Sequence, residues 1–322
     1  MNTQVGDLKR IPFILPSETS ENIVATLASN NVNIKKELNT FRIFETNFAK
    51  NPLLISLEGL LKDRILSHLS FENRKYTEIL INETIINEKI FDLYELNAED
   101  INQVKTKTGQ SVGGLPVVEE AKRSFFNEIP IDHDVLRDTI MNLDVICFDD
   151  QHYEVINAEL NSLFQNNNNL EEFCIRHQVN PINVWYWFKE SNILPQGRAH
   201  DISMEFIADV CRTILMDDED GIIPLVGLPN EPKLLDRLEH HCLQNGFTSA
   251  QFMQLDGLLG HPLNEFIEHH FFKNFSDHLN LFMYLPKTPF IWHLSSGEHH
   301  GFEAYIIIYK WNISASLITT TT

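Results

Sequence analysis

Hydrophobic residues recur at steps of three and four along most of this chain, which is the spacing of amphipathic helices. A first helix is predicted over residues 17–38, with Ser17 or Thr19 as its N-cap. Residues 54–96 repeat the spacing and predict two more helices, the first of them carried by Leu57, Leu60, Leu61, Ile65 and Leu69. The first part of the chain therefore reads as helical.

The same pattern returns after residue 200. Residues 203–221 predict one amphipathic helix that Gly221 ends after an acidic run, Asp-Asp-Glu-Asp. A helix over 231–245 follows, with Asn230 as its expected cap, and Thr248 with Gln251 forms a capping-box pattern for the next one. The last predicted helix covers 261–286 and stops at Pro286.

A different period appears near the end of the sequence. Residues 290–294 read FIWHL and residues 302–311 read FEAYIIIYKW, both rich in β-branched and aromatic side chains, with glycines between them. Two such runs around a turn predict an antiparallel hairpin. The expected fold class is mainly α with a small antiparallel β-hairpin near the C-terminus, that is, α+β.

Two breaks interrupt the helical pattern. Residues 106–116 read TKTGQSVGGLP, which carries three glycines and a proline, and residues 165–173 begin with a run of asparagines that favours a loop. The second break is short and is interpreted as a loop. The first coincides with the boundary between two of the three predicted regions. The three regions are a helical region 1–115, a helical and aromatic region 116–200, and a helical region 201–322 that ends in the hairpin.

The net charge of the chain limits the classes of function that it can have. Acidic residues outnumber basic ones by 45 to 25, and the formal net charge is −20. Tight binding of nucleic acid needs lysine and arginine to neutralise phosphates, so this chain alone is a poor candidate for it. The four cysteines form no close pair, which indicates free, mostly buried thiols in a reducing compartment. No apolar run reaches membrane-spanning length and no signal peptide is recognisable, so a cytoplasmic protein without a membrane partner is predicted.

The sequence contains no complete catalytic motif. Two patterns suggest a metal site and a nucleic-acid-binding surface, but both have simpler explanations. Glu265 and His269 share a helix face at a spacing of four, close to His261 and Glu268, but zinc needs at least three converging ligands. Histidines that lie on solvated helix faces also explain this pattern of residues, so no metal site is predicted. The aromatic run VWYWF at 184–188 lacks a surrounding basic groove and is interpreted as core.

Most of the chain, and most strongly residues 180–312, resembles large adenine-specific DNA methyltransferases of the BREX phage-defence (PglX-type) and fused restriction–modification families. The stretch PFIWHLSSGEHHGFEAYIIIYKWN is similar to a family segment with Trp, Ser-Gly, Gly-Phe and Ile-Tyr at corresponding places. The earlier blocks MEFIADVCRTILMDDEDGIIPL, NVWYWFKESNILPQGRAHDI and FAKNPLL resemble family segments in the same order. The matching positions in the last block are Pro289, Trp292, Ser296, Gly297, Gly301, Phe302, Ala304, Ile308, Tyr309 and Asn312.

The chain departs from the family in the motifs that carry catalysis. Family members grip the flipped adenine with an (N/D/S)-P-P-(Y/F) loop and bind S-adenosylmethionine at a glycine-containing turn. This chain has no Pro-Pro, and its two Asn-Pro pairs, Asn51-Pro52 and Asn180-Pro181, continue differently. Glu298 stands where the family has a basic residue, and the tail ISASLITTTT departs from the family's helix in a way that suggests an early end.

The sequence therefore predicts a non-catalytic portion, on the C-terminal side, of a BREX adenine-specific DNA methyltransferase. S-adenosylmethionine would be the cofactor of the parent enzyme and not of this chain. The expected partners are the methyltransferase core, other BREX components, and DNA through the whole enzyme. The residues expected to contact DNA or the core are Lys189, Arg198, Trp292 and Lys310. Two alternatives stay open: a stand-alone acidic interaction protein, and a metal-dependent hydrolase that uses the Glu-His-His triplets.

Overall fold

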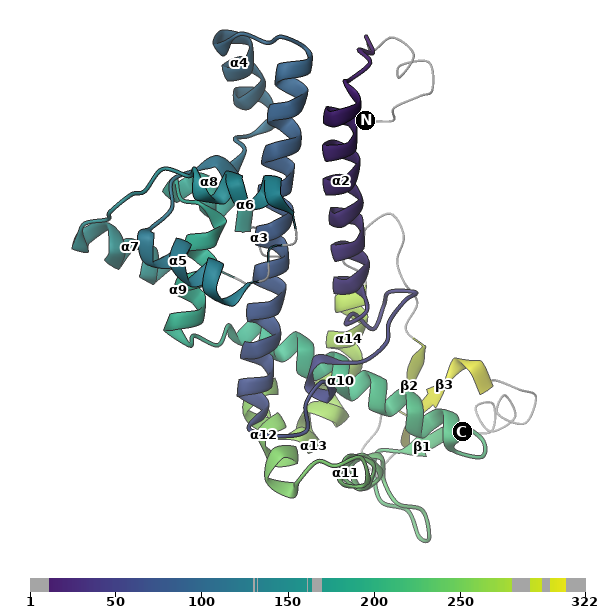
Figure 1. Ribbon diagram of the computed structural model, residues 1–322. Coiled ribbons are helices and arrows are strands. Elements are labelled where there is room, and N and C mark those ends of the chain that lie inside the picture. Colours follow the sequence, from purple (N-terminus) through teal and green to yellow (C-terminus); the bar gives the residue numbers. More distant parts are fainter. Residues whose placement is uncertain are drawn as a thin grey trace. The chain divides into compact units, whose positions relative to one another are not determined.

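A computed structural model describes residues 12–129, 131, 133–160, 162–163, 170–279, 290–296 and 302–310 of the chain. The described chain is mainly helical, with one small three-stranded antiparallel sheet (Figure 1). The α+β fold class predicted from the sequence is confirmed, and the hairpin is part of a slightly larger sheet. Within the described ranges, no helix is both long enough and apolar enough to cross a membrane.

The chain forms two compact units, each assembled from segments that are far apart in sequence. Unit 1 consists of Met1–Glu37, Ser70–Leu163 and Asn167–Ile193, and unit 2 of Leu38–Leu69, Phe164–Asn166 and Leu194–Thr322. The three regions predicted from the sequence divide the chain at other positions than these two units do. They stay a prediction.

Two long helices supply much of unit 1. Helix α2 covers Glu18–Asn39, and Ser17 precedes it with its hydroxyl accepting from the backbone N–H of Ser20 at 3.3 Å. Helix α3 is one continuous helix over Leu61–Leu93, so the prediction of two helices in this stretch was wrong. Neither proline nor glycine interrupts α3, and its buried threonines Thr77 and Thr84 donate to carbonyls one turn earlier, which keeps them compatible with the helix.

Shorter helices complete unit 1 around an apolar core. Trp185, Trp187 and Phe188 are all buried, which confirms that the aromatic run is core. Trp185 meets the ring of Phe125 edge-on at 5.3 Å, and both belong to a cluster that includes Leu27 of α2 and Ile81 of α3. The elements are α4 (Ala98–Thr108), η2 (Val112–Gly114), α5 (Glu119–Glu128), α6 (Asp134–Met141), α7 (Asp150–Leu160), α8 (Leu170–His177) and α9 (Pro181–Ser191).

Helix α10, Gln196–Asp217, is the central element of unit 2. It contacts the short helix η1 (Pro52–Leu54), helices α11 (Leu234–Gln244), α12 (Ser249–Leu259) and α14 (Phe271–Leu279), and strand β3 (Glu303–Ile307). Seven consecutive residues of α10, 202–208, are therefore buried. The prediction of a helix with a single apolar face underestimated this burial. The helix also begins earlier than predicted, at Gln196, directly after Pro195, whose backbone is extended.

The remaining helices of unit 2 match their sequence signals in part. Helix α12, Ser249–Leu259, begins with the predicted capping box between Thr248 and Gln251. Helix α11, Leu234–Gln244, begins after Lys233, and Asn230 lies in a preceding turn with a φ of 68°, so the predicted cap was wrong. The last predicted helix consists of α13 (Leu263–Glu265), a π-helical turn (Phe266–His270) and α14 (Phe271–Leu279); its predicted end at Pro286 lies outside the described residues.

Three strands form the sheet of unit 2, in the order β1-β3-β2. Strand β1 is Ile222–Pro224, β2 is Ile291–Ser295 and β3 is Glu303–Ile307. Strand β3 pairs antiparallel with both neighbours, so Ile222, Ile306 and Trp292 stand side by side across the sheet. The predicted hairpin pairing of β2 and β3 is confirmed. The predicted turn between them, and the asparagine run 166–169, lie outside the described residues.

Candidate functional site

Sequence blocks that are separated by about seventy residues meet in the sheet of unit 2. The block that ends in Asp-Gly-Ile-Ile-Pro supplies α10 and β1, and the later aromatic block supplies β2 and β3. Tyr305 fixes this sheet to the π-helical turn, because its buried hydroxyl donates to the carbonyl of Ile267 at 2.6 Å. Its ring also contacts Phe271 of α14 and His293 of β2, at 5.8 and 5.3 Å. Burial raises the pKa of the Tyr305 hydroxyl well above its usual range.

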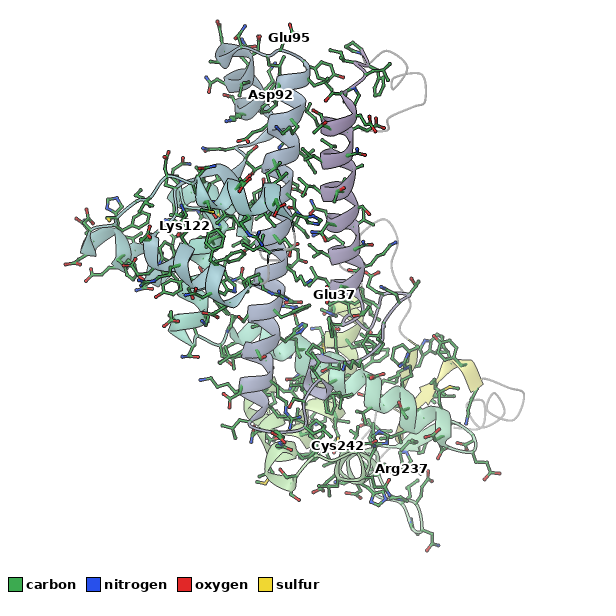
Figure 2. All side chains as sticks on the ribbon, viewed as in Figure 1. Glu37, Asp92, Glu95, Lys122, Arg237 and Cys242 are labelled. Atoms are coloured by element: carbon green, nitrogen blue, oxygen red, sulfur yellow. The ribbon has the colours of Figure 1, made fainter. Side chains whose placement is uncertain are left out.

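The acidic turn between α10 and β1 is built by hydrogen bonds within unit 2. Asp218 accepts from the backbone of Gly221 at 3.0 Å and from the Arg237 guanidinium at 2.6 Å, and Asp220 accepts from the backbone of Ile222 at 2.8 Å. Burial opposes ionisation of Asp218, but the hydrogen bonds from Arg237, Asp220 and the backbone of Gly221, together with the charge of Arg237, outweigh it and lower the pKa of that carboxyl. Burial, together with the neighbouring Asp218, raises the pKa of Asp220. Figure 2 shows Arg237 on α11.

Gly221 has no room for a side chain. Its φ of 76° lies in the left-handed region, and a Cβ there would come within 2.9 Å of Ile307 and 3.1 Å of Lys310. Lys310 folds over this glycine and donates from its ammonium to the carbonyl of Asp218. The predicted contact residue Lys310 is therefore already engaged in closing the turn.

Lys189 is engaged in a similar way in unit 1. Its ammonium pairs with the carboxylate of Glu128 on α5 and lies 5.5 Å from the centre of the Trp185 ring. The lysine pairing holds the pKa of Glu128 below its usual value. Lys189 thus joins α9 to α5, and the side chain is about one-third exposed.

The other two predicted contact residues lie on separate elements of unit 2. Arg198 is half-buried in the first turn of α10, where its charge contributes to lowering the pKa of Asp201 against the opposing effect of burial. Trp292 on β2 keeps 44% of its surface exposed. Tyr309, in the 3-10 turn η4 (Ile308–Lys310) that follows β3, is 66% exposed. It was a position of the family resemblance but was not predicted as a contact residue.

Both Asn-Pro pairs serve as helix starts. Asn51 precedes η1, and its amide accepts from the backbone of Leu53 and donates to the carbonyl of Ile202. Asn180 precedes α9 in the same way, accepting from Ile182 and donating to Gly113 at 2.7 Å. Both asparagine side chains are fully buried, so neither presents a free amide to a flipped base.

Glu205, a buried carboxylate in α10, was not singled out from the sequence. Glu205 is 3% exposed and accepts from the ring Nε2 of His278 at 2.8 Å and from the backbone of Ile43 at 3.1 Å. Arg42 lies 3.5 Å from the same carboxylate. The available signal was the position of Glu205 between two apolar residues, Met204 and Phe206, that are both buried. These contacts fix the residue 40–51 loop to α10 and α14.

The cysteines offer no activated nucleophile among the residues described. The four thiols are free, and Cys174, Cys211 and Cys242 are buried, as predicted. Burial raises the pKa of all three, that of Cys242 to about 12, so they stay protonated at neutral pH. Cys147 is exposed.

One group among the described residues places three potential metal ligands together: His261, Glu265 and His270. It includes two of the residues considered from the sequence, but His270 takes the place expected for His269. Comparisons of the chain with protein-family models, curated proteins and solved structures found no match.

Proposed function

We propose that this chain is a non-catalytic portion of an adenine-specific DNA methyltransferase of the BREX phage-defence type. The parent enzyme would transfer a methyl group from S-adenosylmethionine to the N6 atom of adenine in duplex DNA. The chain would act in the cytoplasm, together with the methyltransferase core and other BREX components, and it would meet DNA as part of the whole enzyme.

One observation carries this proposal. The sequence blocks that resemble the methyltransferase family after residue 200 are distant in sequence, yet they form one folded substructure of α10, β1, β2 and β3. Two residues of these blocks have structural roles there: Gly221 closes a turn in a conformation that favours glycine, and Tyr305 anchors β3 to the π-helical turn. Such agreement favours shared architecture over chance similarity of short motifs.

The state of the polar residues supports a non-catalytic role. Asn51 and Asn180 are buried and hydrogen-bonded to backbone groups, and Lys189 and Lys310 are paired within their own units. With a net charge of −20, the chain is better suited to contact a basic protein surface than DNA phosphates. We expect the exposed aromatic residues Trp292 and Tyr309 to contribute to that contact, because exposed aromatics are enriched at protein interfaces.

The test is co-purification with a separately expressed methyltransferase core of the BREX family, followed by transfer of labelled methyl groups to DNA. We expect a stable complex whose methylation differs in rate or extent from that of the core alone. Trp292→Ala combined with Tyr309→Ala should weaken the complex, whereas Met253→Ala, which changes a 70% exposed apolar residue of α12, should not.

Two results would overturn the proposal. Methylation of DNA by the purified chain alone would contradict the non-catalytic role. Failure to bind the core, with retention of a different basic protein, would favour the second candidate, a stand-alone acidic interaction protein; the strongly negative charge is the observation that keeps this candidate in view.

A further inference from the structure

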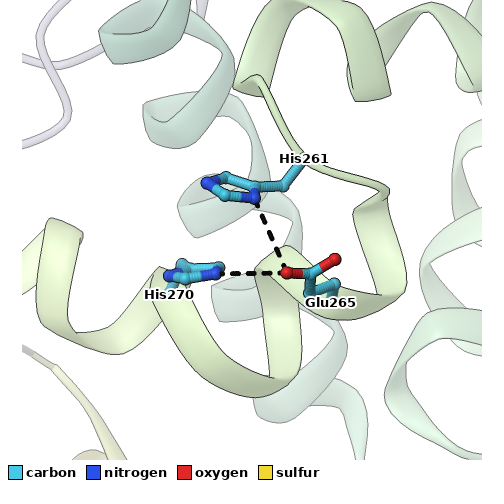
Figure 3. Close-up of side chains that lie close together, drawn as sticks. All are labelled: His261, Glu265 and His270. Carbon is cyan, nitrogen blue, oxygen red and sulfur yellow. Dashed lines mark ion pairs between the residues drawn. The ribbon is translucent and has the colours of Figure 1, made fainter.

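Three side chains of unit 2 converge on one point at the surface (Figure 3). His261 follows α12, Glu265 ends α13 and His270 ends the π-helical turn. The Nδ1 atom of His261 and the Nε2 atom of His270 each lie 3.7 Å from the same carboxylate oxygen, Oε1 of Glu265. The ligand atoms of all three residues lie within 4.8 Å of one another, and each side chain is between 36% and 48% exposed.

The π-helical turn decides which histidine joins this group. In a regular α-helix, Glu265 would share its face with His269, the pairing considered from the sequence. The turn over Phe266–His270 adds one residue to the helical repeat, so the side chain five residues after Glu265 comes round to it instead. Such bulges cost stability in a helix and occur frequently at functional sites. The bulge is thus an observation independent of the ligand residues themselves.

His261 is held by a well-defined turn. Gly260 ends α12 in the left-handed conformation, with a φ of 77°, and Pro262 follows His261 directly. The side chain of Asp256 reaches across this turn and accepts from the backbone N–H of Leu263 at 2.8 Å. The backbone on both sides of His261 is therefore fixed, and only the rotation of its side chain stays adjustable.

We propose that His261, Glu265 and His270 bind a divalent transition-metal ion, with Zn²⁺ as the best fit. Two imidazoles and one carboxylate are a zinc ligand set that leaves a fourth position for water. Bonds of about 2.0–2.1 Å in a tetrahedron place the ligand atoms about 3.3 Å apart. The two distances of 3.7 Å are close to that spacing, and both are longer than a hydrogen bond.

The arrangement of the rings is consistent with a site that closes when the ion enters. The two imidazole rings stack with centroids 4.2 Å apart, and rotation of the exposed side chains brings their nitrogens to the ion without moving the backbone. Imidazole nitrogens favour Zn²⁺ over Mg²⁺ or Ca²⁺, which prefer oxygen ligands. Because Ile267 in the π-helical turn accepts from Tyr305, a bound ion would also reinforce the junction between this turn and β3.

The experiment is a calorimetric titration of the full chain, without a histidine tag, with Zn²⁺ and separately with Mg²⁺. We expect one equivalent of Zn²⁺ to bind and Mg²⁺ to bind far more weakly. His270→Ala should weaken Zn²⁺ binding more than about 100-fold, a larger loss than that of an outer-shell partner. The matched control is His269→Ala, which removes the neighbouring exposed histidine and should change the affinity less than about threefold.

Two further measurements keep the outcome unambiguous. Glu265→Gln keeps the size of the side chain and should also abolish binding, and circular dichroism should show that both variants keep the helical fold. Co²⁺ bound at this site should give the intense visible absorption of tetrahedral coordination. Equal Zn²⁺ affinity in wild type, His270→Ala and Glu265→Gln would overturn the proposal and assign the binding to other histidines, such as His240 and His241.

Discussion

Unit 2 contains two glutamates that each stand between two basic side chains, and they differ in almost every other respect. Glu205 is 3% exposed and is held by hydrogen bonds of 2.8 and 3.1 Å to His278 and Ile43. Glu265 is nearly half exposed, and its two histidines stay at 3.7 Å. The carboxylate of Glu205 is hydrogen-bonded to protein groups, whereas that of Glu265 can accept a further ligand.

This difference separates a structural role from a binding role. A buried carboxylate must be fully paired, because water cannot solvate it, so the partners of Glu205 are part of the fold. An exposed carboxylate needs no partner, so nothing in the stability of the fold requires His261 and His270 to face Glu265. Their convergence across a π-helical bulge therefore calls for a reason other than stability.

The largest effect should follow from removing the buried carboxylate. We expect Glu205→Ala to lower the free energy of unfolding by about 3 kcal/mol, at the lower end of the cost of breaking a buried ion pair. The lower end applies because the Arg42 side chain is 28% exposed. Urea denaturation measures the change. Glu239→Ala, at an exposed position of α11, is the control and should change stability by less than about 0.5 kcal/mol.

His278→Ala should have a somewhat smaller effect. It removes a buried hydrogen bond to Glu205 and the edge-on contact with Phe44, whose ring centre lies 5.6 Å away, but it leaves Ile43 and Arg42 in place. A cost of about 2 kcal/mol is expected for an acceptor that loses a buried partner. His278→Gln supplies another donor and should recover part of that loss. Equal stability of His278→Ala and wild type in urea would contradict the structural role of this network.

Tyr305→Phe tests the tie between the sheet and the π-helical turn. The variant loses only the hydroxyl that donates to Ile267, so we expect a cost of about 1 kcal/mol in the free energy of unfolding. Tyr309→Phe makes the same chemical change at a residue that is 66% exposed, and it should be neutral in the same measurement. A neutral Tyr305→Phe would mean that the turn does not depend on this anchor.

The smallest effect on stability should come from the exposed group. In the presence of a chelator, His261→Ala and His270→Ala should each change the free energy of unfolding by less than about 0.5 kcal/mol, as expected for exposed ion pairs. Added Zn²⁺ should raise the melting temperature of the wild type and leave both variants unchanged, because an ion stabilises only the state that binds it. A clear loss of stability in the chelator would give these histidines a structural role instead.

The sequence predicted the features that depend on local spacing. The fold class, the hairpin, the Thr248–Gln251 capping box and the aromatic core around Trp185 all follow from period, turn residues and propensity. Helix starts were less accurate: Asn230 lies in a turn before α11, since a potential capping residue does not fix where the backbone becomes helical.

Features that depend on tertiary contacts could not be predicted from the spacing of residues in the sequence. Glu205 was not singled out, because its burial depends on the contacts that the 40–51 loop and α14 make with α10. The pairing of Glu265 with His270 depends on a π-helical turn, and the regular α-helical period pointed to His269. Asn180 was considered only as part of a missing catalytic motif, whereas its buried amide fixes the 113–115 loop to α9.

The most direct test is a paired comparison of Glu205→Gln and Glu265→Gln, each measured by urea denaturation in a chelator and by Zn²⁺ titration at a temperature where both are folded. We predict opposite results. Glu205→Gln should unfold at lower urea concentration and bind Zn²⁺ like the wild type, whereas Glu265→Gln should unfold like the wild type and lose more than about 100-fold in Zn²⁺ affinity. Wild-type Zn²⁺ affinity in Glu265→Gln, or wild-type stability in Glu205→Gln, would contradict the division of the two glutamates into a binding and a structural residue.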